Sequence, residues 1–178
     1  MRLLDPKLLG QHLDGLYRAA WALCGSREDA EDLVQDTFAR VLARPRLIHG
    51  DERGYLMRAL RNTFYSRLRT DSRRPQTAAT LDDLQPPDPR TVHQPEQAIE
   101  VKEVLEAIAA LPEDFRLAIV AVDVLGLSYA EAGRALDARE ATITTRLYRA
   151  RQRIARGLSQ EPASGGTREG SGPKRSLA

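Results

Sequence analysis

Side chains that can hold nucleic acid recur along one face of a predicted helix at residues 52–69. They lie mostly at spacings of three and four residues, which brings them together on a helix, and comprise Arg58, Arg61, Asn62, Tyr65 and Arg69. Arginine can hold phosphates, tyrosine can stack on an unpaired base, and asparagine can pair with adenine. The opposite stripe, expected to be buried, is Leu56, Leu60, Phe64 and Leu68. This pattern indicates a nucleic-acid face, and an ordinary exposed polar face is the alternative.

A second arginine-rich helix is predicted from Glu140 to about Gly157, with the buried stripe Ile143, Leu147, Ala150 and Ile154. Its predicted outward residues are Thr142, Thr145, Arg146, Arg149 and Arg153. Before it, Ser128 and Glu131 have the capping-box spacing and start a short helix that ends near Leu136. Asp137 begins a second capping pattern. A short capped helix, a turn and a longer basic helix predict a helix-turn-helix that binds duplex DNA, and a solvated basic face is the alternative.

A third polar face belongs to a predicted helix that begins after Ser26 and stops at Arg44-Pro45. It carries Asp29, Asp32, Gln35 and Asp36, opposite the apolar stripe of Ala30, Leu33, Val34, Phe38, Val41 and Leu42. Acids near a helix N-terminus interact favourably with the helix dipole and are usually just solvated. Residue types alone therefore favour an ordinary solvated surface, with no binding function, for this face.

Composition excludes several classes of protein. The net charge of +2 conceals seven Arg against one Asp in 53–74, and six Arg against one Glu in 139–156, as two contacts with a polyanion require. The single cysteine, Cys24, excludes a disulfide framework and a multi-cysteine metal site, and the three histidines lie far apart. We expect no catalytic residues, metal or cofactor. The longest apolar run, 117–122, is too short for a membrane span, and Asp5-Pro6 interrupts any signal peptide, so we expect a cytoplasmic protein without membrane insertion.

The predicted fold is all-α, with two small helical domains joined by a flexible linker and a helix-turn-helix in the second domain. The first helix is expected to start at Asp5-Pro6 and to bury Leu9, Leu13, Leu16, Ala20 and Cys24. Five prolines among Thr, Asp and Gln mark the linker at 74–95. The domains are therefore expected at 1–73 and 96–158. The Gly- and Ser-rich tail at 159–178 is expected to be disordered.

Three segments, in order, resemble bacterial sigma factors. Residues 29–38 (DAEDLVQDTF) resemble the helix that binds core RNA polymerase, and residues 55–62 (YLMRALRN) resemble the promoter-melting helix. Residues 125–132 (LGLSYAEA) with 141–151 (ATITTRLYRAR) resemble the C-terminal helix-turn-helix. Two domains with a short linker resemble the extracytoplasmic-function (ECF) group of sigma factors.

The resemblance implies a role for each face. Asp29, Asp32, Gln35 and Asp36 would bind the clamp helices of the polymerase beta-prime subunit, and the beta flap would be a further contact. Arg58, Arg61, Asn62, Tyr65 and Arg69 would bind the minus-ten element and hold a melted strand. Arg139, Thr144, Thr145, Arg146, Tyr148 and Arg149 would read the minus-thirty-five element. Core polymerase, promoter DNA and an anti-sigma factor are the implied partners. The alternative function is a helix-turn-helix regulator that does not join polymerase, which would leave the acidic face and the first basic face unused.

Overall fold

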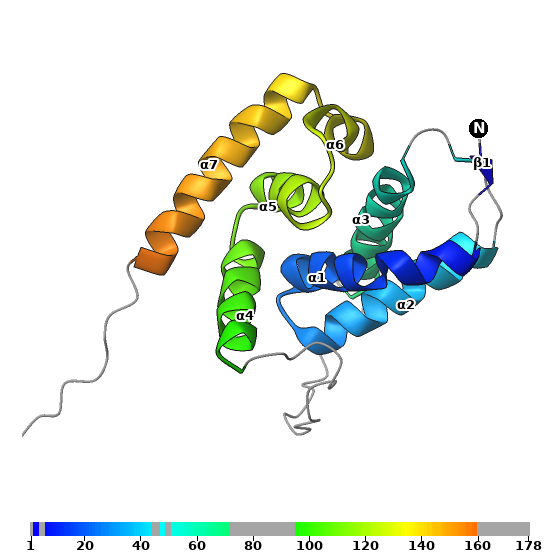
Figure 1. The fold of residues 1–178 in the computed structure, drawn as a ribbon, viewed down its shortest axis with the longest axis horizontal. Coiled ribbons are helices and arrows are strands. Elements are labelled where there is room, and N and C mark those ends of the chain that lie inside the picture. Colours follow the sequence, from blue (N-terminus) through cyan, green and yellow to red (C-terminus); the bar gives the residue numbers. More distant parts are fainter. Residues whose placement is uncertain (1, 4–5, 44–46, 49–50, 72–94, 160–178) are drawn as a thin grey trace, which may run out of the picture.

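The computed structural model describes residues 2–3, 6–43, 47–48, 51–71 and 95–159, and within these ranges the chain is almost entirely helical (Figure 1). A 3-10 segment η1 (Pro6–His12) leads into α1 (Leu13–Cys24), followed by α2 (Arg27–Ala43) and α3 (Glu52–Asp71). The C-terminal helices are α4 (Pro95–Ala109), α5 (Glu113–Ile119), α6 (Tyr129–Leu136) and α7 (Glu140–Ser159). Two short strands, β1 (Arg2–Leu3) and β2 (Leu47–Ile48), pair antiparallel. The all-α prediction is confirmed; the linker before Pro95 and the tail after Ser159 lie outside the described residues.

The N-terminal helices α1, α2 and α3 pack against one another around a shared apolar centre. Gly25, with φ of 80°, ends α1 and donates its N–H to the carbonyl of Trp21. Ser26 Oγ accepts the Asp29 N–H at 3.2 Å and so caps α2. The predicted buried stripes are confirmed at their centres, where the side chains of Leu16, Leu33, Leu56 and Leu60 are at most 1% exposed.

Three leucines predicted in these stripes are exposed instead. Leu13, Leu42 and Leu68 retain 45%, 49% and 46% of their surface. Each lies at or near one end of its helix. A helix does start at Pro6, as predicted, but its type differs from the prediction. Residues 6–12 form a 3-10 helix, and the α-helix begins only at Leu13.

The C-terminal helices contain a π-helical turn, η2 (Val120–Val124), that directly continues α5. The helical spacing of Phe115, Ile119, Val122 and Leu125 predicts one regular α-helix that ends at Gly126. Instead the Leu125 N–H bonds to the carbonyl of Val120, which shifts the side-chain register and leaves Val122 only half-buried. Gly126, with φ of 70°, then turns the chain toward α6.

The predicted capping box at the start of α6 is confirmed. Ser128 Oγ accepts the Glu131 N–H at 3.3 Å, and the Glu131 carboxylate accepts the Ser128 N–H at 2.9 Å. The second capping pattern was wrong, because Asp137 has φ of 57° and closes α6 instead of capping α7. Aspartate tolerates this left-handed conformation better than most residues do. The turn is tight enough that a Cβ at Gly133 would lie 2.7 Å from the Ala138 carbonyl.

The N-terminal and C-terminal helices share one apolar core. α1 packs on α4 and on η2, while α3 packs on α6 (Figure 1). Leu16 and Leu60 on one side belong to the same buried cluster as Ile108 and Leu125 on the other. The packing of α3 on α6 places the arginine-bearing helix beside the helix-turn-helix.

Candidate polymerase and nucleic-acid interfaces

The acidic face of α2 is exposed, as predicted, at all four of its members: Asp29, Asp32, Gln35 and Asp36. The structure adds a basic partner that the sequence did not single out. Arg67 of α3 places Nη2 3.4 Å from Asp32 and Nη1 3.5 Å from Asp36. Both aspartate side chains stay more than half exposed, at 60% and 53%. The carboxylates therefore remain accessible to a basic partner while one arginine offsets part of their charge.

The predicted basic face of α3 is split between solvent and the C-terminal helices. Asn62 and Arg69 are exposed. Arg58 donates from Nη2 to the backbone carbonyl of Arg134 in α6, and Tyr65 donates its hydroxyl to Glu113 of α5. Arg61 is half-buried, and its Nε finds no acceptor within the described part of the chain. The face is thus one face of the helix, as predicted, but part of it is occupied.

Tyr65 has an altered acid–base behaviour because of this position. Burial raises the pKa of its phenol to about 12, and the hydrogen bond to the Glu113 carboxylate acts in the same direction. Deprotonation would put two negative charges against each other at a 2.5 Å contact. The hydroxyl therefore serves as a hydrogen-bond donor over the whole physiological range.

Asn62 borders a shallow hollow of about 200 Å³ between α2 and α3. The lining residues include Arg40 of α2 and Tyr55 and Arg58 of α3. An aromatic ring, an amide and two guanidinium groups around one hollow are groups that stack on bases, pair with base edges and hold phosphates. This exposed end of the α3 face is suited to an unpaired nucleotide.

The helix-turn-helix forms as predicted, with Ile143, Leu147 and Ala150 of α7 fully buried against the core. Five of the six predicted reading residues are exposed: Arg139, Thr144, Thr145, Tyr148 and Arg149. Tyr148 keeps 65% of its surface. The Thr144 and Thr145 hydroxyls donate back to the carbonyls of Glu140 and Ala141.

Two arginines expected to face outward on α7 are engaged by neighbouring side chains. Arg146 is half-buried with Nη2 2.8 Å from Asp114 of α5. The Arg153 guanidinium lies 4.9 Å from the centre of the Phe115 ring. Both lie at the edge of the buried stripe, where a long side chain reaches back to α5.

The sequence reasoning also missed two residues of α7. Arg151 makes a bidentate pair with Asp123 at 2.6 and 3.0 Å, which raises the pKa of its guanidinium and anchors α7 to η2. Gln152 donates Nε2 to the Tyr148 hydroxyl at 2.7 Å. Gln152 lies one turn beyond Tyr148, so the same helical spacing could have placed it on the outward face.

A pocket of about 520 Å³ brings the two predicted DNA faces together. Arg61 and Tyr65 of α3 line it beside Arg139, Thr142 and Arg146 of the helix-turn-helix, with Asp114 among them. Residues predicted to bind two different promoter elements therefore meet at one junction.

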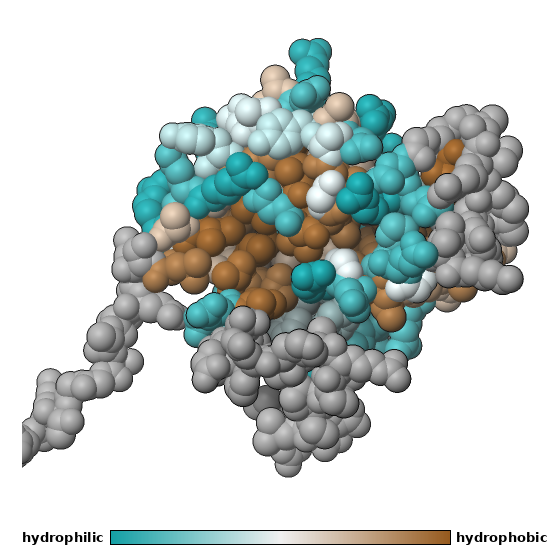
Figure 2. All heavy atoms as spheres, viewed as in Figure 1, coloured by the Kyte–Doolittle hydropathy of each residue, from teal (hydrophilic) through white to brown (hydrophobic). Residues whose placement is uncertain are grey.

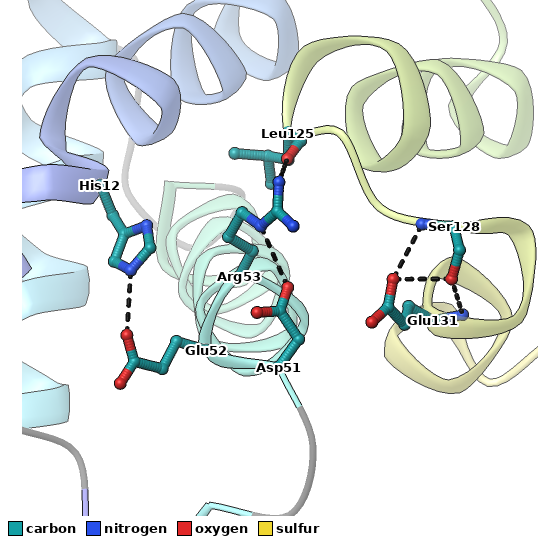
Figure 3. A network of polar contacts seen from close by, with 7 residues as sticks. All are labelled: His12, Asp51, Glu52, Arg53, Leu125, Ser128 and Glu131. Carbon is teal, nitrogen blue, oxygen red and sulfur yellow. Dashed lines mark hydrogen bonds and ion pairs between the residues drawn. The ribbon is translucent and has the colours of Figure 1, made fainter.

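A polar network fixes the start of α3 beside the helix-turn-helix (Figure 3). His12 Nε2 lies 3.1 Å from the buried Glu52 carboxylate, and Arg53 pairs with Asp51 at 3.1 Å. Arg53 also donates to the carbonyl of Leu125, ahead of the Ser128–Glu131 capping box. The first turn of α3 is thereby tied both to η1 and to the segment after η2.

Apolar side chains gather on the face formed by α4, α5 and the end of α7 (Figure 2). On α4, Val101 and Val104 keep 47% and 38% of their surface, and Leu158 near the end of α7 keeps 42%. Among the helices of the described ranges, none is long and apolar enough to cross a membrane. Within those ranges no group of three or more His, Cys, Asp or Glu forms a candidate metal site. Burial raises the pKa of the Cys24 thiol to about 11, so the thiol stays protonated at neutral pH.

The structure thus defines an all-helical protein with a helix-turn-helix, an arginine-bearing face on α3 and an exposed acidic face on α2. Two family models match the chain: Sigma-70 region 2 over residues 8–74, and Sigma-70, region 4 over residues 102–154. ECF RNA polymerase sigma factor SigM of Mycobacterium tuberculosis is 35% identical over 152 residues, covering 84% of this chain and 74% of that protein. SigE of Mycolicibacterium smegmatis is 33% identical over 153 residues, and the chain spans only 59% of its length.

Solved structures share the fold. The sigma factor RpoE of Bartonella quintana, in complex with the anti-sigma factor NepR, has a TM-score of 0.63 at 24% identity, over 89% of this chain and 100% of that chain. CnrH in complex with the cytosolic domain of CnrY has a TM-score of 0.63 at 21% identity, over 88% of each chain. This chain belongs to the ECF RNA polymerase sigma factors.

Proposed function

We propose that the chain binds core RNA polymerase, directs it to specific promoters and assists opening of the promoter strands. The observation that carries the proposal is that this member of the ECF family has exposed acids on α2 and arginines on α3 in addition to a helix-turn-helix. A regulator that only binds duplex DNA needs just the last of these. The chain would act in the cytoplasm, with no catalytic residue of its own.

The acidic face would bind the clamp helices of the polymerase beta-prime subunit. Asp32 and Asp36 support this role because their carboxylates are largely exposed and can reach basic side chains. The apolar face with Val101, Val104 and Leu158 is the surface we assign to the beta flap. An anti-sigma factor that covers one of these faces is the further partner that family membership implies.

The two DNA contacts would divide between the domains, taken as residues 1–73 and 96–158. The α3 face would bind the minus-ten element, with Asn62 at an unpaired base and Arg58, Arg61, Tyr65 and Arg69 along the strand. The exposed set Arg139, Thr144, Thr145, Tyr148 and Arg149 would read the minus-thirty-five element. Arg146 would join it as a phosphate contact after release from Asp114.

Run-off transcription tests the proposal directly. Core polymerase with the purified chain should give discrete transcripts from a promoter library, and core alone should not. Copurification with core should accompany them. Duplex binding without transcripts or copurification would instead favour the helix-turn-helix regulator.

A further inference from the structure

The outward side of α7 carries three hydroxyl side chains among the residues proposed to read DNA: Thr144, Thr145 and Tyr148. The two threonines use their protons within the helix, because their hydroxyls donate to the carbonyls of Glu140 and Ala141. A hydroxyl whose proton is engaged can still accept a hydrogen bond through its oxygen. Toward a base edge, both threonines therefore act as acceptors.

Tyr148 is in the opposite situation because of Gln152. The Gln152 amide donates Nε2 to the phenol oxygen at 2.7 Å. The phenol proton therefore points away from the amide, and the side chain keeps 65% of its surface, so the proton is accessible to another molecule. Tyr148 is thus the hydroxyl of this set that can donate to a bound partner.

The orientation of the Gln152 amide is fixed at its other end by Arg156. The Arg156 Nη2 lies 3.5 Å from Gln152 Oε1, and the Arg156 Nε donates to the Gln152 backbone carbonyl at 3.3 Å. A guanidinium only donates, so the amide oxygen faces Arg156 and the amide nitrogen faces Tyr148. The three residues follow one another at spacings of four, which places them in a row along α7. In such a row each hydrogen bond polarises the next, which makes the phenol a better donor.

The row borders a hollow of about 390 Å³ between the start of α6 and α7. Tyr129 of α6 lines it together with Thr144, Tyr148 and Gln152 of α7. This hollow gives a base edge room next to the exposed phenol. In the major groove, guanine offers the acceptors O6 and N7, adenine offers N7 and thymine offers O4, whereas cytosine offers an amino donor. A phenol that donates at this place would favour the bases that present acceptors.

We propose that Gln152 is a positioning residue for DNA readout: it holds the Tyr148 hydroxyl as a donor and so sets which base edges the helix-turn-helix prefers. The proposal rests on the proposed function, because it takes the outward side of α7 as the surface that reads the minus-thirty-five element. Gln152 acts through Tyr148 and not by its own contact with a base. Its contribution should therefore appear only at the base position that Tyr148 contacts.

A double-mutant cycle in the polymerase holoenzyme tests this dependence. Core polymerase with the wild-type or variant chain transcribes a promoter library, and sequencing of the transcribed templates gives the base preference at each upstream position. Tyr148→Phe identifies the position that the hydroxyl reads. Gln152→Ala should reduce the preference at that same position by about twofold to tenfold, the range of one hydrogen bond. In the Tyr148→Phe background, Gln152→Ala should change the preference no further.

Gln152→Glu should change the preference in the opposite direction. A carboxylate only accepts, so it would take the Tyr148 proton and leave the phenol oxygen as an acceptor toward DNA. The preference at the Tyr148 position should then move toward bases that present an amino group. Gln11→Ala, at an exposed position of η1, is the matched control and should keep the wild-type preferences. Circular dichroism checks that every variant remains helical.

Four results would overturn the proposal. They are an unchanged preference with Tyr148→Phe or with Gln152→Ala, effects of these two substitutions at different positions, additive effects in the double variant, and a wild-type preference with Gln152→Glu. The contact itself is measured in the free chain by nuclear magnetic resonance. The side-chain amide resonance of Gln152 should shift on Tyr148→Phe while that of Gln11 stays in place, and an unmoved Gln152 resonance would equally overturn the proposal.

The proposed function is scored separately. Absent transcripts with every chain, the wild type included, would reject it, while the amide resonance would still decide whether Gln152 holds the Tyr148 hydroxyl.

Discussion

Arg67 sets how much negative charge the acidic face of α2 presents. It lies between Asp32 and Asp36, so two carboxylates share one guanidinium and leave a net charge of about −1 at this point. Both pairs are largely exposed, and exposed pairs contribute at most about 1 kcal/mol each. The fold therefore depends little on them, whereas a basic partner would depend on their charge.

Reversing these charges should weaken the binding of core polymerase while the helices stay folded. Asp32→Arg with Asp36→Arg places three arginines together, and the unfolding free energy should fall by only about 1–2 kcal/mol. A pull-down titration with core polymerase measures the affinity. Asp14→Arg with Glu106→Arg adds the same charge at exposed acids elsewhere and should leave the affinity intact. Equal affinities for both variants would return the α2 acids to a purely solvated role.

Asn62 separates strand capture from duplex binding. Asn62→Ala removes a donor and an acceptor but keeps a helix former at an exposed position. Strand opening should weaken by about 1–3 kcal/mol, the usual worth of a good contact to a base. Permanganate reactivity of promoter thymines, with core polymerase present, measures it. Thr70→Ala, another exposed site on α3, should open the strands normally. Full reactivity with Asn62→Ala would remove this residue from the melting face.

The helix-turn-helix depends on the cap that starts α6. Ser128→Ala should lower the unfolding free energy by about 0.5–2 kcal/mol. The hydrogen bonds from Ser128 hold the pKa of the Glu131 carboxyl below its ordinary value. Because the pKa of this carboxyl is lower in the folded than in the unfolded chain, its ionised form stabilises the fold at a pH above the unfolded pKa. This stabilisation is lost as the pH falls through the folded pKa. Thermal unfolding at neutral and at acidic pH should show the deficit shrinking in acid. A deficit that persists undiminished in acid would contradict this account of the cap.

Two arginines of α7 should behave oppositely when replaced. Arg149 is exposed, so Arg149→Ala should reduce the salt dependence of duplex binding by about one phosphate contact. Arg151 is anchored by Asp123, so Arg151→Ala should lower thermal stability and change the salt slope less. Binding titrations over a salt series give both slopes. Identical salt slopes for the two variants would mean that the DNA-facing side of α7 has been assigned to the wrong residues.

At the scale of helices, the sequence predicts most of what is observed, because local geometry determines it. Gly25, Gly126 and the Ser128–Glu131 spacing end and start helices through contacts within a few residues. What was missed depends on neighbours. Periodicity assigns Leu68 to the apolar side of α3 but does not say that the core ends before it. Likewise, Asp137 is a residue type that suits a cap, and the backbone conformation of the turn decides otherwise.

At the scale of the whole molecule, the sequence predicted two domains and gave no sign that they pack together. The contact between Arg116 and the Leu23 carbonyl spans 93 positions, and no local pattern encodes such a distance. The spacing placed Arg58, Arg61 and Tyr65 on one face of α3, and the structure shows that this face meets the C-terminal helices. Their engagement by Arg134 and Glu113 follows only from the packing of α3 on α6 and its approach to α5.

The titration of Tyr65 should report on whether α3 lies against α5. Burial raises the pKa of this phenol from 10.0 to about 12, with Glu113 acting in the same direction. The packed form, in which α3 lies against α5, prefers the protonated phenol. The stabilisation that the phenol gives this form is fully present below pH 10 and is lost as the pH rises through about 12.

Replacing Glu113 by alanine should therefore move the pKa of Tyr65 down toward 10.0, because both causes of the shift weaken when the helices separate. Ultraviolet difference spectra measure tyrosinate, and a Tyr65→Phe chain identifies the contribution of this residue among the five tyrosines. Glu106→Ala serves as the control, since its carboxylate contacts Lys102 within α4 and should leave the titration unchanged. A Tyr65 pKa near 10.0 in the wild-type chain would show that the phenol is solvated, and hence that α3 does not rest on α5 in solution.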